Sequence, residues 1–290
     1  MKDRRFDETT IRHHLTGAIA VAVALSSLWM QLDAEQVGVQ RKGRLNKVIE
    51  AVEQGRAAVA NQEWRFIDME HQPFSADRLD SILTEMGKDR DASGRLKLTP
   101  LVRIPQEGDE DFKWAVKQVL DAGVFGVILP HVDTREEAVG LVRAMRYPQM
   151  RNTKYPEPRG LRGWGPGRAV KLWGVANDRE YHSKADVWPL NPDGELFAVA
   201  MIESGEAVKN IREILQAPVS AIFVVPGDMS IDLGLGPRGE KNSPEVDANY
   251  QTVLKACLAQ KTVICGCGDS RSNMKKRLDE GWKFFLPLGG

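Results

Sequence analysis

The sequence contains little cysteine, little histidine and no excess of charge of either sign. It has 290 residues with three cysteines and five histidines, and 40 Lys and Arg residues balance 40 Asp and Glu residues. A neutral chain offers no basic surface of the kind that binds nucleic acids or anionic membranes. Its length suits one large domain, such as an α/β barrel, or two small ones. We therefore expect a site for small molecules, with no nucleic acid and no membrane as partner.

The cysteines are too few and too clustered to form a disulfide framework, and such sparse usage is typical of a reducing compartment. They are Cys257, Cys265 and Cys267. Cys265 and Cys267 share one face of an expected strand, but no second Cys or His pair lies nearby to complete a metal site. Packing as buried apolar side chains is the better interpretation.

No apolar run reaches the roughly 20 residues that a membrane helix needs. The uncharged run Leu15–Met30, LTGAIAVAVALSSLWM, instead has the length of a signal-peptide core, although acidic residues dilute the arginines before it and LDA is a poor cleavage site. We expect residues 1–40 to form an apolar segment that stays in the mature, cytoplasmic protein and packs against the barrel. The alternative is a signal peptide, with export to the periplasm through residues 1–34.

Residues 41–290 alternate short apolar runs with segments of helical period, which is the pattern of repeated βα units. Helix starts are marked by a capping-box spacing at Thr134 and Glu137 and by cap residues at Ser204 and Ser243. Continuously apolar strands are typical of parallel sheets covered on both faces. The expected strands are 64–69, 99–104, 124–130, 196–203, 219–225, 261–267 and 282–288. These runs predict an α/β fold, a (β/α)₈ TIM barrel with one strand uncertain.

A long connection, residues 148–192, is rich in glycine, proline and tryptophan. Its GWGPG motif is not a phosphate-binding fingerprint, because no Lys-Ser/Thr follows it and it does not join a strand directly to a helix. Irregular segments of this length are usually functional when they are ordered. We expect this segment to form a lid over the mouth of the barrel.

Polar side chains follow the expected strands at their carboxyl ends. They are Glu70, His71, Arg103, Glu203 and Asp228. The carboxyl ends of barrel strands meet at one mouth, so these side chains are expected to share a pocket. Carboxylates suit Mg²⁺ or Mn²⁺, a guanidinium binds carboxylates and developing enolates, and an imidazole exchanges protons near neutral pH. Together they could make or break a carbon–carbon bond beside a carbonyl.

Each of these residues alone has a simpler interpretation. Arg103 could pair structurally with Asp68 or Glu70, and Asp228 could be a helix cap or a solvated loop charge. His131 also follows a strand, but it has no clear role. Only the convergence of the group favours a catalytic site.

Seven motifs, in this order and spacing, resemble the HpcH/HpaI aldolase family, relatives of the citrate lyase β subunit. They are IDMEH, PLVRIP, KQVLDAG, ILPHVDTREEA, RGLRGWG, MIESGEAVKNI and VPGDMSIDLG. The resemblance covers residues 45 to 288 and implies a metal-dependent class II aldolase that cleaves or forms 4-hydroxy-2-oxo acids through a pyruvate enolate. It also implies a 2-oxo acid and an aldehyde as small-molecule partners. We also expect a homo-oligomer.

The resemblance implies a role for each matching residue. Glu203 and Asp228 would bind the divalent metal, Mg²⁺ or Mn²⁺ with Co²⁺ as a further possibility. Arg103 would bind the 2-oxo acid and stabilise its enolate. The turn amides near Gly227 and Asp228 could receive the substrate carboxylate.

The acid–base role falls, by the same resemblance, on the IDMEH motif. His71 would move the aldol proton, Asp121 of QVLDAG would orient it, and Glu70 would support the metal or its surroundings. The polar residues at the end of this motif would thus be part of the catalytic site.

Three departures from the family pattern are visible. Met201 stands where many members have Gln, which removes a polar contact near the metal. Few residues precede Trp64, so either residues 17–30 supply the first strand or the first β/α unit is irregular. The chain stops at Gly290, directly after the last expected strand, so the final helix of the family is missing.

Two other functions remain open. A citrate-lyase-like enzyme would cleave malyl thioesters, but it would need a basic groove for a coenzyme A nucleotide, and no such cluster is evident. A barrel that binds a 2-oxo acid without turnover is the non-enzymatic alternative.

Overall fold

A computed structural model describes residues 43–237, 239 and 243–289. Residues 44–290 form one compact unit. The predicted N-terminal segment, residues 1–40, lies outside the described residues. Within the described part of the chain, no helix is long and apolar enough to cross a membrane.

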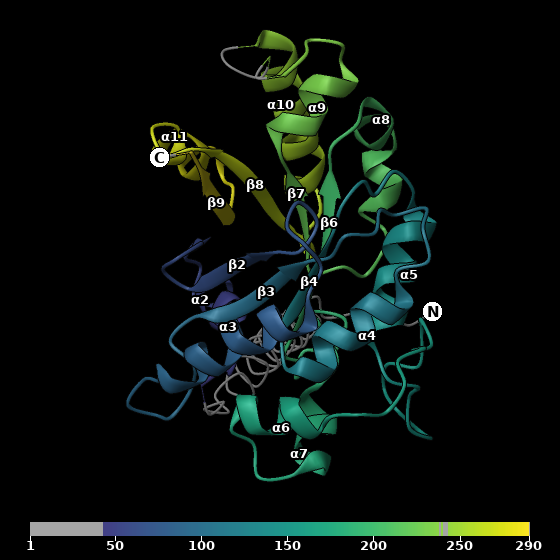
Figure 1. The fold of residues 1–290 in the computed structure, drawn as a ribbon. Coiled ribbons are helices and arrows are strands. Elements are labelled where there is room, and N and C mark those ends of the chain that lie inside the picture. Colours follow the sequence, from purple (N-terminus) through teal and green to yellow (C-terminus); the bar gives the residue numbers. More distant parts are fainter. Residues whose placement is uncertain (1–42, 238, 240–242, 290) are drawn as a thin grey trace, which may run out of the picture. The chain divides into compact units, whose positions relative to one another are not determined.

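Eight parallel strands curve into a nearly closed barrel, in the order β1-β9-β8-β7-β6-β4-β3-β2 (Figure 1). The strands are β1 Ala58–Val59, β2 Trp64–Asp68, β3 Thr99–Arg103, β4 Gly126–Leu129, β6 Leu196–Ile202, β7 Ala221–Val224, β8 Ile264–Ser270 and β9 Phe284–Leu288, with a short β5 Val187–Trp188 paired beside β6. The predicted TIM-barrel fold is confirmed.

Helices follow most of the strands and cover the outside of the barrel. They are α2 Lys47–Glu53, α3 Ala76–Lys88, α4 Lys113–Ala122, α5 Arg135–Met145, α6 Gly167–Trp173, α7 Asp178–Lys184, α8 Gly205–Ile214, α9 Pro226–Asp232, α10 Pro244–Leu258 and α11 Met274–Glu280. The predicted caps are confirmed: Thr134 and Glu137 form a capping box at α5, and Ser204 and Ser243 cap α8 and α10. These caps fix where each helix begins after a strand end.

The first β/α unit is irregular, as expected. Strand β1 has two residues and pairs with β9, and residues 60–63 alone connect it to β2. A two-residue strand advances by only about 7 Å, so a turn can return the chain without a crossover helix. Asn61 completes this turn with a positive φ of 66°, and its backbone N–H donates to Trp64 O.

Aromatic side chains fill the amino-terminal half of the barrel interior. Phe284 of β9 stacks on Trp64 of β2, with ring centroids 4.4 Å apart, and contacts Phe197 of β6 and Phe223 of β7. These strands are not all neighbours, so their rings meet across the barrel axis. Because these aromatic rings fill the amino-terminal half, the open mouth lies at the carboxyl end of the barrel.

Residues 148–192 do not lie over this mouth. The connection begins where α5 ends and stops where β6 begins, which places it at the amino-terminal end of the strands. The Trp173 ring stacks on Phe125, just before β4, and its Nε1 donates to Gly123 O at 3.0 Å. Helices α6 and α7 accordingly lie at the opposite end of the view from α9 (Figure 1). The segment is therefore not a lid over the mouth, as predicted, but packs against the outer helices and the amino-terminal end of the barrel.

Two of the three cysteines form a disulfide, contrary to expectation. Cys257 at the end of α10 is bonded to Cys265 near the start of β8, with Cα atoms 5.9 Å apart. Cys267 is free and buried, as predicted for an apolar packing residue. The α10–β8 turn brings the two sulfurs together, although sequence spacing alone did not indicate it.

Candidate active site

The candidate catalytic residues lie at the carboxyl ends of four strands, β2, β3, β6 and β7, whose places in the barrel Figure 1 shows. Glu70 and His71 follow β2, and Arg103 is the last residue of β3. Glu203 follows β6, and Asp228 lies in the first turn of α9, directly after β7. Since all these strands are parallel, residues separated by up to half of the chain meet at one end of the barrel.

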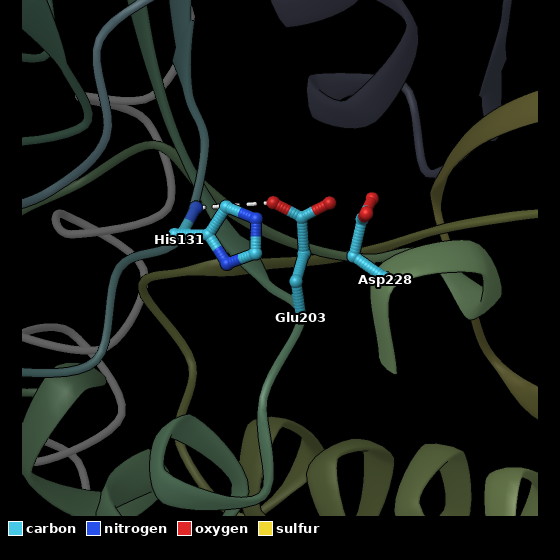
Figure 2. A group of neighbouring side chains, drawn as sticks. All are labelled: His131, Glu203 and Asp228. Carbon is cyan, nitrogen blue, oxygen red and sulfur yellow. Dashed lines mark hydrogen bonds between the residues drawn. The ribbon is translucent and has the colours of Figure 1, made fainter. Parts of the chain in front are cut away.

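Glu203 and Asp228 lie together, as predicted, and His131 joins them. One ligand atom from each of the three side chains lies within 4.8 Å of the other two. Figure 2 shows the imidazole and the two carboxylates arranged side by side. These donors are a nitrogen and two hard oxygens, which fit a divalent ion.

The environment of Glu203 also favours a cation. Its side chain is 1% exposed, and burial raises its pKa to about 7. Oε2 accepts a hydrogen bond from the backbone N–H of His131 at 3.0 Å. Among the described residues none donates to the other carboxylate oxygen or to Asp228. These oxygens are therefore available to a cation or to water.

Arg103 is held by two acidic residues from the neighbouring strand end. Its Nε and Nη2 donate to the two carboxylate oxygens of Asp68 at 3.0 and 2.9 Å, and Nη1 lies 2.7 Å from Glu70 Oε2. Burial alone would raise the pKa of Asp68, but the hydrogen bonds from Arg103 bring that pKa below its usual value. The pairing that the sequence left open as a structural alternative is therefore formed.

His71 is the most exposed member of the site. Its side chain is 59% exposed, and Nε2 lies 3.5 Å from Glu70 Oε2. Burial raises the pKa of Glu70, although the nearby Arg103 guanidinium opposes the shift. An exposed imidazole beside a carboxylate can exchange protons with a bound substrate or with water.

Asp121 does not orient His71 within this chain. It lies on α4, outside the barrel, and its Oδ1 accepts from Arg162 Nη2 at 2.8 Å. Arg162 is almost fully buried and also donates to the Tyr181 hydroxyl. The predicted contact between Asp121 and His71 is therefore absent from the described residues.

The first turn of α9 presents to the mouth backbone N–H groups that have no partner among the described residues. Gly227 and Asp228 are the second and third residues of this helix, and Val225 provides no side-chain cap. The first N–H groups of a helix have no partner within the helix and favour anions. A Cβ at Gly227 would meet nothing within 4 Å, so the space before it is open.

Two acidic residues, Asp133 and Asp232, connect the loops of the site, and no role was predicted for them from the sequence. Asp133 accepts from the Ser204 hydroxyl at 2.5 Å, and its carbonyl accepts from Asn210 Nδ2. Asp232, at the end of α9, accepts from the backbone N–H of Gly205 at 2.7 Å. These bonds attach the His131 loop and α9 to the segment that follows Glu203. The only sequence signal was their position within four residues of a candidate site residue.

Comparisons with known proteins identify relatives of this chain. The family model HpcH/HpaI aldolase/citrate lyase matches residues 51–284. A hydroxypyruvate/pyruvate aldolase from Rhizorhabdus wittichii is 32% identical over 222 residues, which cover 75% of each chain. A 4-hydroxy-2-oxo-heptane-1,7-dioate aldolase from Klebsiella pneumoniae is 31% identical over 80% of this chain and 76% of its own.

Solved structures show the same fold. An HpcH/HpaI aldolase from Desulfitobacterium hafniense aligns with a TM-score of 0.65 at 24% identity, over 83% of this chain and 89% of its own. A family protein from Burkholderia cenocepacia aligns with a TM-score of 0.61, also at 24% identity, over 85% and 84%. The family match and the relatives above 30% identity establish the relationship: the chain belongs to the HpcH/HpaI aldolase/citrate lyase family.

Proposed function

We propose that the chain is a metal-dependent class II aldolase, a carbon–carbon lyase that cleaves or forms 4-hydroxy-2-oxo acids through a pyruvate enolate. The observation that carries this proposal is the group of His131, Glu203 and Asp228, which shares the barrel mouth with Arg103. The aldolase names of the relatives support the reaction class. A 2-oxo acid and an aldehyde are the small-molecule partners.

The metal site and Arg103 would act on the 2-oxo acid together. Glu203 and Asp228 would hold Mg²⁺, Mn²⁺ or Co²⁺, and the bound ion would supply electrostatic stabilisation of negative charge on the keto oxygen. Arg103 has N–H groups beyond those directed at Asp68 and Glu70, and these would bind the developing enolate oxygen. The free amides of Gly227 and Asp228 would bind the substrate carboxylate.

The proton transfer would fall to His71. Its exposure leaves Nδ1 and Nε2 accessible to the aldehyde side of the substrate, and the Glu70 carboxylate lies beside the imidazole. Asp121 would assist only from a second copy of the chain, because it lies outside this barrel. Trp114 lies on the same helix as Asp121, and Trp164 directly precedes Gly165, which lies beside Asp121. Both tryptophans are exposed, and exposed apolar surface near Asp121 supports a homo-oligomer.

Exchange of the pyruvate methyl protons in deuterated water tests enolate formation without knowledge of the aldehyde. We expect exchange with Mg²⁺, Mn²⁺ or Co²⁺ and none after chelation. Glu203→Gln and Asp228→Asn should each weaken metal binding strongly, as measured by calorimetric titration, while the circular dichroism spectrum stays unchanged. Undiminished metal affinity in both variants would refute the site, and binding of pyruvate without exchange would indicate a non-catalytic barrel.

A further inference from the structure

His131 lies in the candidate metal site but belongs to neither of the predicted metal-binding motifs. It follows β4 by two residues, and one of its ring nitrogens lies within 4.8 Å of both carboxylates. An ion with bonds of about 2.1 Å separates its ligand atoms by about 3 to 4 Å. The three donors therefore need only small adjustments to meet one ion.

The backbone at His131 is held in an unusual conformation that keeps the side chain at the site. Its φ is 45°, in the left-handed region that few non-glycine residues adopt. In this conformation its N–H donates to Glu203 Oε2. Residues in sparsely populated backbone regions persist only when the surrounding structure stabilises them. The same residue thus orients one carboxylate and presents a ring nitrogen beside it.

Hydrogen bonds between loops preorganise the three donors. Asp133, two residues after His131, accepts from Ser204, the residue after Glu203. Asp232, one helical turn after Asp228, accepts from the N–H of Gly205. These bonds connect the backbone segments that carry the three candidate ligands and so fix the positions of those segments relative to one another.

We propose that His131 is a third protein ligand of this metal site and that its imidazole gives the site a preference for Co²⁺ over Mg²⁺. The inference rests on the proposed function, because it concerns the same ion. Imidazole nitrogen binds Co²⁺ well, whereas Mg²⁺ prefers oxygen donors and keeps several waters. Glu203 and Asp228 alone would leave the choice of ion to oxygen ligands.

Titration of the metal-free, full-length protein with Co²⁺ and with Mg²⁺ tests the proposal without an activity assay. His131→Asn is the informative variant, because Asn tolerates a positive φ, and His131→Gly checks the result in a residue without backbone strain. Both should lower Co²⁺ affinity at least about tenfold and Mg²⁺ affinity less. The visible absorption spectrum of bound Co²⁺ should also change.

A matched control separates ligation from a simple ion pair. Glu107 Oε1 lies 3.9 Å from His131 Nε2, so Glu107→Gln removes that pair and leaves the imidazole in place. We expect Glu107→Gln to retain the parental Co²⁺ affinity and spectrum. Parental Co²⁺ affinity and spectrum in both His131 variants would overturn the proposal. If Glu203→Gln also binds Co²⁺ as the parent does, the proposed function is refuted as well. If Glu203→Gln loses Co²⁺ binding and the His131 variants do not, only the role of His131 as a ligand is refuted.

Discussion

Arg103 is the residue whose structural and catalytic roles overlap most closely. Its three nitrogens contact Asp68 and Glu70, so it would be well placed without any substrate. Arg103→Lys keeps the charge but cannot reproduce a planar two-point contact. We expect the variant to fold and bind metal, with pyruvate proton exchange lowered by roughly 10²-fold or more, as for a lost oxyanion donor.

Asp68→Asn is the matched control for Arg103. It preserves the guanidinium and one oxygen acceptor, and it removes the partner's charge and the second acceptor. Exchange should fall less than in Arg103→Lys if Arg103 acts on the enolate. Equal losses in the two variants would show that Arg103 works through its pairing with Asp68, and a near-parental rate in Arg103→Lys would assign it a structural role.

At the scale of elements, Arg146 attaches the long connection to the barrel. It ends α5, its side chain is fully buried, and its guanidinium pairs with Asp186 at 2.6 and 3.0 Å. It also donates to the carbonyls of Tyr155 and Pro158. Arg146→Met would remove the donor to these two carbonyls and the cationic partner of Asp186. We expect the free energy of unfolding to fall by about 3 kcal/mol, because breaking a buried pair costs more than the pair contributes.

Urea denaturation followed by circular dichroism measures this loss. Lys275→Met is the control, because Lys275 pairs with Asp279 on an exposed face of α11. Its free energy of unfolding should stay within about 0.5 kcal/mol of the parent. Similar stability in both variants would show that Arg146 does not hold the connection.

At the scale of the whole molecule, the disulfide bears on where the protein works. Disulfides persist in oxidising compartments, so the redox state of Cys257 and Cys265 in the native protein distinguishes the exported alternative from the cytoplasmic expectation. In denaturant without reductant, a thiol assay should detect only Cys267 of the three cysteines. Detection of all three thiols in protein isolated from its native host would contradict the bond there. Mass spectrometry of the same protein should show a chain that begins near Glu35 if residues 1–34 are a signal peptide.

Local patterns in the sequence determined the barrel and the position of most candidate side chains. Apolar runs, the capping box at Thr134 and the caps at Ser204 and Ser243 are read within a few residues, and the structure confirms them. The carboxyl end of a parallel strand is also a local property. It therefore placed Glu203 and Asp228 at one mouth before their distance was known.

Only the tertiary structure decided which partners these side chains have. His131 meets Glu203 across 72 positions of the chain, and Asp121 pairs with Arg162 rather than with His71. The sequence likewise did not predict the disulfide or the position of residues 148–192 at the amino-terminal end of the barrel. Periodicity reports which face of an element is buried, but the choice among several chemically suitable partners depends on how loops fold back between distant elements.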